Sequence, residues 1–130
     1  TNTLAVSSIS SSLNISASAF YGDGSNLLNA GLISNVRTSA THLTASATDE
    51  FIVMNNPQPA TASLPSINSL SGNRYTIKRT GNADVQVSCS AGNKIEGFLD
   101  TVDLVTKGDF VSLVSDGSNS WLIVGKSGSF

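Results

Sequence analysis

A chain of 130 residues with a mass of 13.4 kDa has the size of one domain, which excludes most multidomain enzymes. Only 12% of the residues are charged, the formal net charge is -2 and no basic run occurs, so we expect no nucleic-acid partner. The uncharged stretch of residues 1–22 is too rich in serine to span a bilayer, and we expect no membrane insertion. Because the chain begins with Thr rather than Met, we expect it to be a piece of a longer protein.

The first part of the chain, residues 1–40, predicts an extended, serine-rich arm. Apolar and small polar residues alternate over 13–19, as in a strand with one apolar face. A helical spacing over 6–13 is the weaker alternative, because serine side chains compete for backbone hydrogen bonds. The apolar residues after the turn at 22–26 are too few to close a core. Since such an arm cannot offset its ordering entropy as a monomer, we expect it to be disordered or shared between chains.

The remaining residues, 41–130, predict a compact all-β head. Tyr75 and Ile77 alternate with Thr76 and Lys78, which indicates one buried and one solvated face. Turn-forming Gly, Asn, Asp and Pro separate the apolar runs, and this spacing predicts a small β-sandwich or jelly-roll-like head. The expected strands are 51–54, 61–64, 74–79, 84–88, 94–96, 102–106, 110–115 and 121–124.

The tetrapeptide Asp-Gly-Ser-Asn occurs twice, at 23–26 and at 116–119. Its residues suit a tight turn, in which glycine takes a positive φ and Asp bonds its own backbone. The alternative is a calcium loop with Asp23 and Asp116 as ligands. Both copies lack the glutamate that an EF-hand loop has at its twelfth position, where Ser34 and Ser127 stand. We therefore expect two structural turns and no metal site.

The usual nucleophilic and metal-binding groups are scarce. The single histidine, His42, precedes the first strand expected in the head, and no Gly-x-Ser-x-Gly motif accompanies it, so we expect a surface or linker residue. Cys89 is the only cysteine, which excludes an internal disulfide, and its alternating neighbourhood predicts a buried, inert thiol. Residues 125–127, Gly-Lys-Ser, lack the preceding glycine and following helix of a phosphate-binding loop, and we interpret them as a polar tail.

Acidic side chains occur in pairs, as glycoside hydrolysis requires. The pairs are Asp49 with Glu50 and Asp100 with Asp103, and Glu96 is near the second pair in the sequence. Between predicted strands such residues normally form solvated turns. We therefore expect no enzyme, no cofactor, and no catalytic, cofactor-binding or metal-binding residues.

Five segments of the chain carry a resemblance to a known family. Residues 19–27, Ala-Phe-Tyr-Gly-Asp-Gly-Ser-Asn-Leu, are similar to an element that recurs in fibre and other virion proteins of tailed bacteriophages. The segments 48–53 through 63–65, 72–78, 93–97 and 114–123 follow in order the pattern of the C-terminal β-domain of many phage tail fibres and tailspikes. The likeness to this C-terminal β-domain covers about residues 41–125.

This resemblance implies an intertwined homotrimer that knits three chains together at a fibre end in the virion. It implies a non-enzymatic structural component that takes part in host-cell attachment, with other virion proteins bound through the arm and a host surface glycan as a further partner. Two alternatives stay open. One is a carbohydrate-binding or degrading tailspike domain that uses the carboxylates with Trp121 or Tyr75, and the other is a capsid decoration or head-fibre protein. No receptor-binding residue is assigned.

Overall fold

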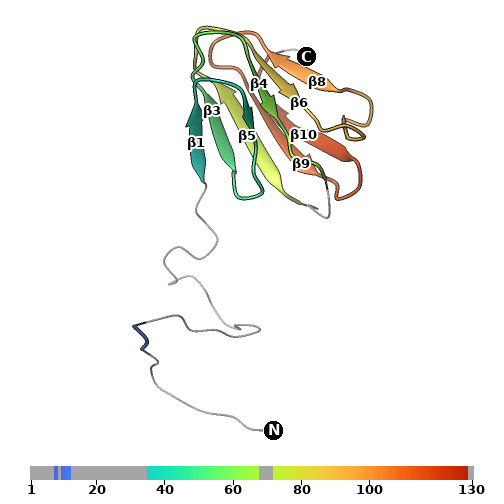
Figure 1. Cartoon of the computed structure of the whole chain (residues 1–130). Helices are drawn as coiled ribbons and strands as arrows, with labels where there is room; N and C mark the ends of the chain where they lie inside the picture. Colours follow the sequence, from blue (N-terminus) through green and yellow to red (C-terminus); the bar gives the residue numbers. More distant parts are fainter. Residues whose placement is uncertain (1–7, 9, 13–34, 68–71, 129–130) are drawn as a thin grey trace. The chain divides into compact units, whose positions relative to one another are not determined.

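The computed structural model describes residues 8, 10–12, 35–67 and 72–128 (Figure 1). The chain divides into two units, Thr1–Leu32 and Ile33–Phe130. In the first unit only the exposed serines at 8 and 10–12 are described, so the strand expected at 13–19 and the turn at 23–26 lie outside the described residues. The second unit, called the β unit below, contains every described strand.

The described part of the β unit consists of strands and turns and contains no helix, so the all-β prediction is confirmed. The strands are β1 (Val36–Ser39), β2 (Leu43–Thr44), β3 (Phe51–Met54), β4 (Ala60–Ser63), β5 (Arg74–Arg79), β6 (Val85–Ser88), β7 (Lys94–Ile95), β8 (Thr101–Leu104), β9 (Phe110–Ser115) and β10 (Ser120–Lys126).

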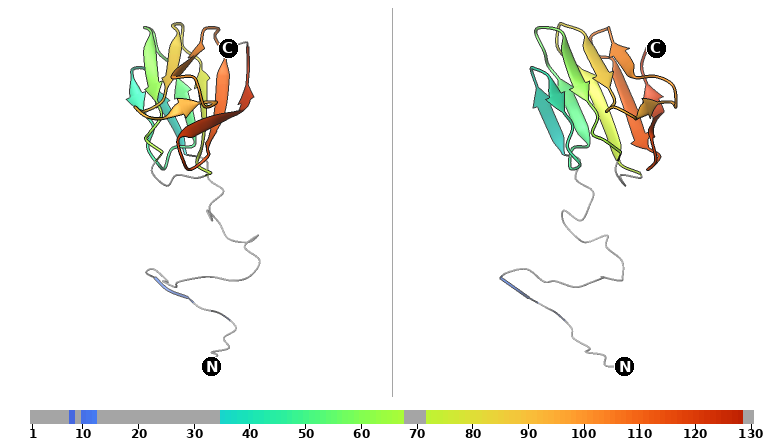
Figure 2. Two further views of the ribbon diagram at one scale, coloured as in Figure 1. Left: turned by 90° about the vertical axis from the view of Figure 1, so that its right-hand side faces the viewer. Right: turned by 45° about the vertical axis from the view of Figure 1, so that its right-hand side comes forward.

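Two sheets make up the fold (Figures 1 and 2). The six-stranded sheet has the order β1-β3-β5-β9-β10-β7, and the four-stranded sheet has the order β2-β4-β6-β8. The first six strands alternate between the sheets, so β1, β3 and β5 pair in parallel in one sheet, and β2, β4 and β6 do so in the other. Parallel pairing is possible because a strand of the opposite sheet separates consecutive neighbours. The pairs β6–β8, β5–β9 and β9–β10 are antiparallel, so both sheets are mixed.

This arrangement is sandwich-like, but its strand directions differ from those of a jelly roll. A jelly roll is built from antiparallel Greek keys. Here the chain coils back and forth between two sheets before the last strands close them. Alternation of apolar and polar residues indicates which face of a strand is buried and carries no information on the direction of its neighbour.

The core lies between the inner faces of the two sheets. Ile52, Ile77 and Leu113 of the six-stranded sheet and Val85 and Leu104 of the four-stranded sheet are fully buried. Tyr75 and Trp121 are also fully buried, with their ring centroids 5.4 Å apart and the rings tilted by 59°. The alternation predicted for β5 is confirmed, because Tyr75 and Ile77 are buried while Thr76 and Lys78 are half-buried.

The β unit begins earlier than residue 41. β1 lies in the range predicted as arm, yet it pairs with β3 over four residues. Its residues Val36, Arg37 and Thr38 are exposed, so the sequence shows no buried face there. β2 has only two residues and gives no periodic signal. Both strands were missed for these reasons, whereas β3, β5 and β9 have the predicted bounds.

Candidate functional site

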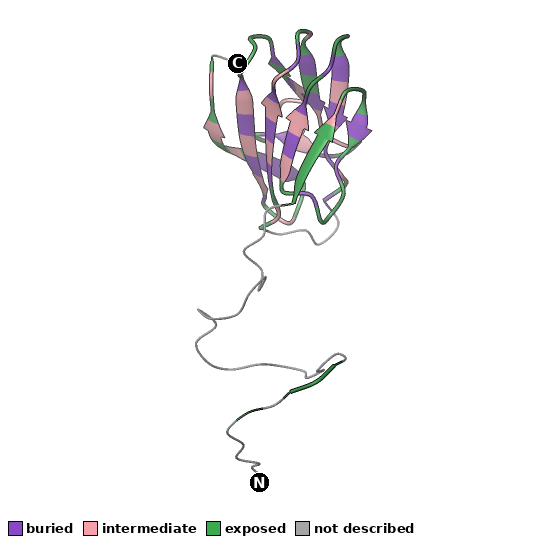
Figure 3. Ribbon diagram, turned by 90° about the vertical axis from the view of Figure 1, so that its left-hand side faces the viewer, coloured by how far each residue is buried: buried purple, intermediate pink, exposed green. Residues whose placement is uncertain are grey.

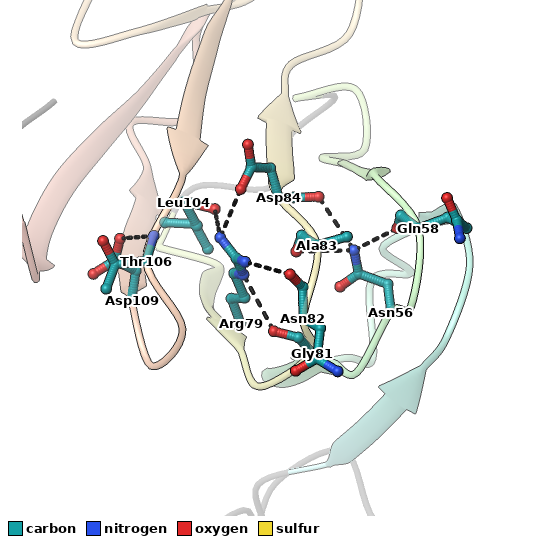
Figure 4. A network of polar contacts seen from close by, with 10 residues as sticks. All are labelled: Asn56, Gln58, Arg79, Gly81, Asn82, Ala83, Asp84, Leu104, Thr106 and Asp109. Carbon is teal, nitrogen blue, oxygen red and sulfur yellow. Dashed lines mark hydrogen bonds and ion pairs between the residues drawn. The ribbon is translucent and has the colours of Figure 1, made fainter.

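The most extensive buried polar network in the described structure surrounds Arg79, at the corner where the chain leaves β5 (Figure 4). The guanidinium group donates hydrogen bonds to the carbonyl oxygens of Gly81, Asn82 and Leu104 at 3.0–3.3 Å. It also forms a 2.8 Å ion pair with Asp84. Arg79 is 5% exposed, so its five N–H donors must be satisfied inside the protein. The side chain therefore ties this corner to the end of β8.

Asn56 forms a similar set of hydrogen bonds at the preceding corner, which follows β3. Its side-chain amide donates to the carbonyl oxygens of Gln58, Ala83 and Asp84 at 2.7–3.2 Å (Figure 4). It thereby joins the corner after β3 to the corner after β5. Corner backbones expose carbonyl groups that no sheet ladder can satisfy, and buried side-chain donors meet that need. The network is structural, and its donors bind backbone carbonyl groups and the Asp84 carboxylate.

Asp109 holds the next corner. Its carboxylate accepts a hydrogen bond from the Thr106 backbone N–H at 2.8 Å and from the Ser127 hydroxyl at 3.1 Å. The Ser127 hydroxyl oxygen in turn accepts from the Phe110 N–H at 2.8 Å. Residues 125–127 were expected to form a polar tail. Instead Gly125 and Lys126 belong to β10 and Ser127 fastens the end of that strand to β9.

The single histidine lies between β1 and β2, not ahead of all the strands as predicted. His42 directly precedes β2, and its Nδ1 accepts a hydrogen bond from the Thr61 backbone N–H of β4 at 2.8 Å. The side chain thus prolongs the pairing of these two strands by one contact. It is exposed, and with Asp84, Gln86 and Asp103 it lines a depression of about 370 Å³ on the four-stranded sheet.

Each acidic residue of the first predicted pair has a separate environment. Asp49 is buried and accepts hydrogen bonds from Arg37 at 3.1 Å and from the Ser46 N–H at 2.9 Å. Burial raises the pKa of Asp49, but the Ser46 N–H and the Arg37 guanidinium outweigh it and hold the pKa below its ordinary value. Glu50 is exposed. A carboxyl group that acts as a general acid needs a raised pKa, whereas the pKa of Asp49 is lowered.

The second group of carboxylates is likewise divided among different partners. Asp100 pairs with Lys94 at 2.7 Å, and this hydrogen-bonded contact raises the pKa of Lys94. Asp103 accepts a 3.3 Å hydrogen bond from Gln86 across the β6–β8 pair. Glu96 accepts from the backbone N–H of Ile123. These three contacts hold loops and strand edges in place, so the carboxylates have structural roles.

Cys89 is half-buried and packs against the core. Its thiol lies 3.1 Å from the Asn93 carbonyl oxygen and 3.3 Å from that of Asp100. Burial, followed by the charge of Asp100, raises the pKa of the Cys89 thiol, although Lys94 acts in the other direction. This basic neighbour was not visible in the sequence. The thiol is protonated at neutral pH and therefore a poor nucleophile.

The second Asp-Gly-Ser-Asn segment is a tight turn, as predicted. Gly117 has a φ of 78°. One carboxylate oxygen of Asp116 accepts hydrogen bonds from the backbone N–H groups of Ser118, Asn119 and Ser120 at 2.8–3.1 Å. The bonds from Ser120 and Ser118 are the main reason why the pKa of Asp116 lies below its ordinary value. Asp23 and its turn lie outside the described residues.

A larger depression, of about 560 Å³, lies at the start of β3 and β5 and is lined in part by Glu50, Phe51, Asn73 and Arg74. Tyr75 and Trp121, which were the aromatic candidates for a sugar site, do not reach it or any other surface, because both are 0% exposed. The alternative of a carbohydrate site therefore cannot use these two rings. Stacking on a sugar requires an exposed aromatic face.

Within the described ranges no cluster of three or more His, Cys, Asp or Glu residues could hold a metal ion. No described helix is long and apolar enough to cross a membrane. The residues on which the described site depends most, Asn56 and Arg79, were not singled out from the sequence. Each ends or follows a strand, and only the stacking of corners in space brings carbonyl groups around them.

In comparisons with known proteins, the sequence matches no family model, and no curated protein shows significant similarity to it.

Proposed function

We propose that the chain is a non-enzymatic structural component of a virion fibre, which trimerises the fibre end and takes part in host-cell attachment. The observation that carries the proposal is apolar exposure on a small β unit. Val36, Phe98, Val105, Leu122 and Val124 are all more than 40% exposed. A small protein that leaves several large apolar side chains in water is suited to association. The uncharged segment of residues 1–22 supports the same conclusion.

The resemblance to phage fibre domains gives this association its biological setting. Of the segments that carry it, those within residues 48–123 include β3, the end of β4, β5, β7 and the β9–β10 hairpin, and each contributes at least one residue to the one hydrophobic core. On this proposal the serine-rich arm joins other virion proteins and a second and third copy of the chain. Closed three-fold assembly lets thin apolar faces bury against their own copies.

The oligomeric state tests the proposal most directly. Light scattering coupled to size exclusion should give a mass of about 40 kDa, three times the chain mass of 13.4 kDa. A monomer at micromolar concentration would refute the fibre assignment, and a dimer would refute its three-fold part. Immunogold labelling of the virion would distinguish a tail fibre from a capsid decoration.

The absence of catalysis is part of the proposal and has its own test. Asp100 and Asp103 each have a separate polar partner, and His42 uses its Nδ1 to accept a backbone hydrogen bond. Purified protein should therefore leave capsule and lipopolysaccharide preparations at full length. Shortening of either preparation, abolished by Asp100→Ala or Asp103→Ala, would establish the degrading alternative instead. Glycan-array binding without cleavage would favour attachment through a sugar.

A further inference from the structure

The hydrogen bond between His42 and Thr61 requires a neutral imidazole ring. The Nδ1 atom of His42 lies 2.8 Å from the Thr61 backbone nitrogen, and a backbone N–H can only donate. Nδ1 must therefore accept, which places the one proton of the neutral ring on Nε2. A protonated ring has a hydrogen on both nitrogen atoms and cannot accept this bond. The contact thus exists in only one of the two charge states of the ring.

The Thr61 N–H has no backbone acceptor at this place in the sheet. Successive N–H groups of a strand point to opposite neighbours. The Ala60 N–H donates to the Asp84 carbonyl oxygen on the β6 side at 3.1 Å, so the Thr61 N–H is directed toward β2. There the Thr41 carbonyl oxygen accepts from the Ser39 hydroxyl at 2.9 Å instead. The His42 side chain therefore takes the position that a ladder carbonyl would have.

Few contacts hold β2 to β4. The strand has only two residues, which pair as Leu43 with Ala62 and Thr44 with Ser63. Both β1 and β2 are edge strands of their sheets, and Figure 3 shows β1 in the colour of exposed residues. Because the ladder between β2 and β4 is so short, the bond from Thr61 to His42 is a large share of what joins the two strands.

The charged groups near His42 come from three neighbouring elements. Asp84, which precedes β6, and Asp103 of β8 line the same depression of about 370 Å³, whereas β2 and β4 carry no charged side chain. Asp84 is ion-paired with Arg79 at 2.8 Å, but none of the ion pairs in the described structure includes Asp103. On the side of β1, the Arg37 guanidinium is already in an ion pair. Since the described lining residues include no Lys or Arg, a protonated His42 ring meets attraction in this depression and no opposing cation.

We propose that His42 is a pH-sensitive contact, whose protonation frees the Thr61 N–H and loosens β2 from β4 in mildly acidic solution. One proton adds to Nδ1, the ring becomes a cation that the carboxylates of the depression attract, and the Thr61 N–H is left to water. Histidine is the side chain that normally titrates between about pH 5 and pH 8, and His42 is the only one in the chain. The contact is therefore present at neutral pH and lost as the pH falls. This inference goes beyond the virion assignment and does not depend on it.

Amide hydrogen exchange of the full chain, followed by NMR, tests the contact. Protection of each amide is expressed relative to an unstructured peptide at the same pH, at about pH 7.5 and about pH 5.5. We expect the protection of the Thr61 amide to fall at least about tenfold on acidification, while the Ala60 amide of the same strand stays protected. An unchanged Thr61 amide, or an equal fall at Ala60, would overturn the inference.

The matched variant is His42→Asn, because its amide oxygen can accept from Thr61 in place of Nδ1 and does not titrate. We expect the Thr61 amide of this variant to stay protected at both pH values. A fall as large as that of the wild type would show that another group is responsible, and would overturn the inference.

A second measurement on the wild-type chain decides the matter if His42→Asn fails to fold. The nitrogen chemical shifts of the imidazole ring report which ring atoms carry protons. We expect the Nε2–H tautomer at about pH 7.5 and both nitrogen atoms protonated at about pH 5.5. The Nδ1–H tautomer at the higher pH, or a ring still neutral at the lower one, would overturn the inference. Neither measurement depends on the oligomeric state, so a monomeric wild-type chain would refute the proposed function and leave this inference standing.

Discussion

Gly81 lies where the corner after β5 contacts the corner after β3. A Cβ atom at this position would lie 2.3 Å from the backbone nitrogen and 2.4 Å from the backbone oxygen of Asn56. Backbone atoms cannot move aside as a flexible side chain can, so the requirement for glycine is steric. The requirement at Gly92 is different, because its φ is +85° and nothing lies within 4 Å of the added atom.

We expect Gly81→Ala to destabilise the β unit by about 3 kcal/mol or more, since overpacking against a fixed backbone forces the corners apart. Gly92→Ala should cost only about 1 kcal/mol, the usual cost of an alanine in the left-handed region. Urea denaturation of both variants measures the difference. Equal losses of stability would show that the two corners do not stack as described.

At the scale of elements, buried hydrogen bonds join the corners and loops that connect the two sheets. Arg79 and Asn56 act at the corners between the sheets. At the corners of the opposite end, the Tyr75 hydroxyl donates to the Ser46 carbonyl oxygen at 2.8 Å, and the Asn93 side chain accepts from the Ile67 N–H at 3.0 Å. Each of these side chains bridges segments that are far apart in sequence.

Arg79→Ala should destabilise the β unit by about 3 kcal/mol, because it leaves buried carbonyl groups without donors. Arg79→Lys should recover only part of this stability, since one ammonium group cannot reproduce the planar fork. Lys107→Ala is the matched control, because the exposed Lys107 side chain contacts the same corner through Asn82. Thermal melts of the three variants provide the measurement. A wild-type melting temperature for Arg79→Lys would contradict the proposed role of the planar guanidinium group.

An ion pair of 3.1 Å between Arg37 of the edge strand β1 and Asp49, which precedes β3, connects β1 to the rest of the sheet. The pKa of Asp49 is lower in the folded than in the unfolded protein. Its contribution to the free energy of unfolding is therefore present above about pH 4 and is lost as the pH falls through the folded pKa. We expect the wild-type melting temperature to fall more steeply between about pH 5 and pH 3 than that of Asp49→Asn. Parallel slopes for the two proteins would show that Asp49 does not contribute.

At the scale of the whole chain, the β unit should melt as one cooperative structure, because both sheets share one core. The single tryptophan, Trp121, is buried in that core and reports its unfolding by fluorescence. Gly117→Val forces a branched side chain into a positive φ and should cost about 1–3 kcal/mol.

The matched change in the arm, Gly24→Val, should leave the Trp121 transition almost unaltered, although Gly24 lies in the other copy of the same tetrapeptide. A similar loss in both variants would mean that arm and β unit unfold together. A rise of several degrees with calcium, removed by Asp116→Ala, would instead identify the second turn as a cation site.

The sequence by itself determined the all-β class of the β unit and the bounds of three strands. β5 alternates apolar and polar residues throughout, β9 does so over residues 111–113, and β3 is a short apolar run followed by turn-forming residues; each of these patterns is local. The Asp116–Gly117 turn was equally predictable, since its hydrogen bonds join neighbouring residues.

Only the tertiary structure decided the direction of pairing, the membership of β1 and β2, and the roles of Arg79, Asn56 and His42. The partners of Arg79 include the Leu104 carbonyl, 25 residues away, and two of the three partners of Asn56 lie 27 and 28 residues away. Each of these features depends on which backbone lies beside which, and a period of two along one strand does not specify its neighbour.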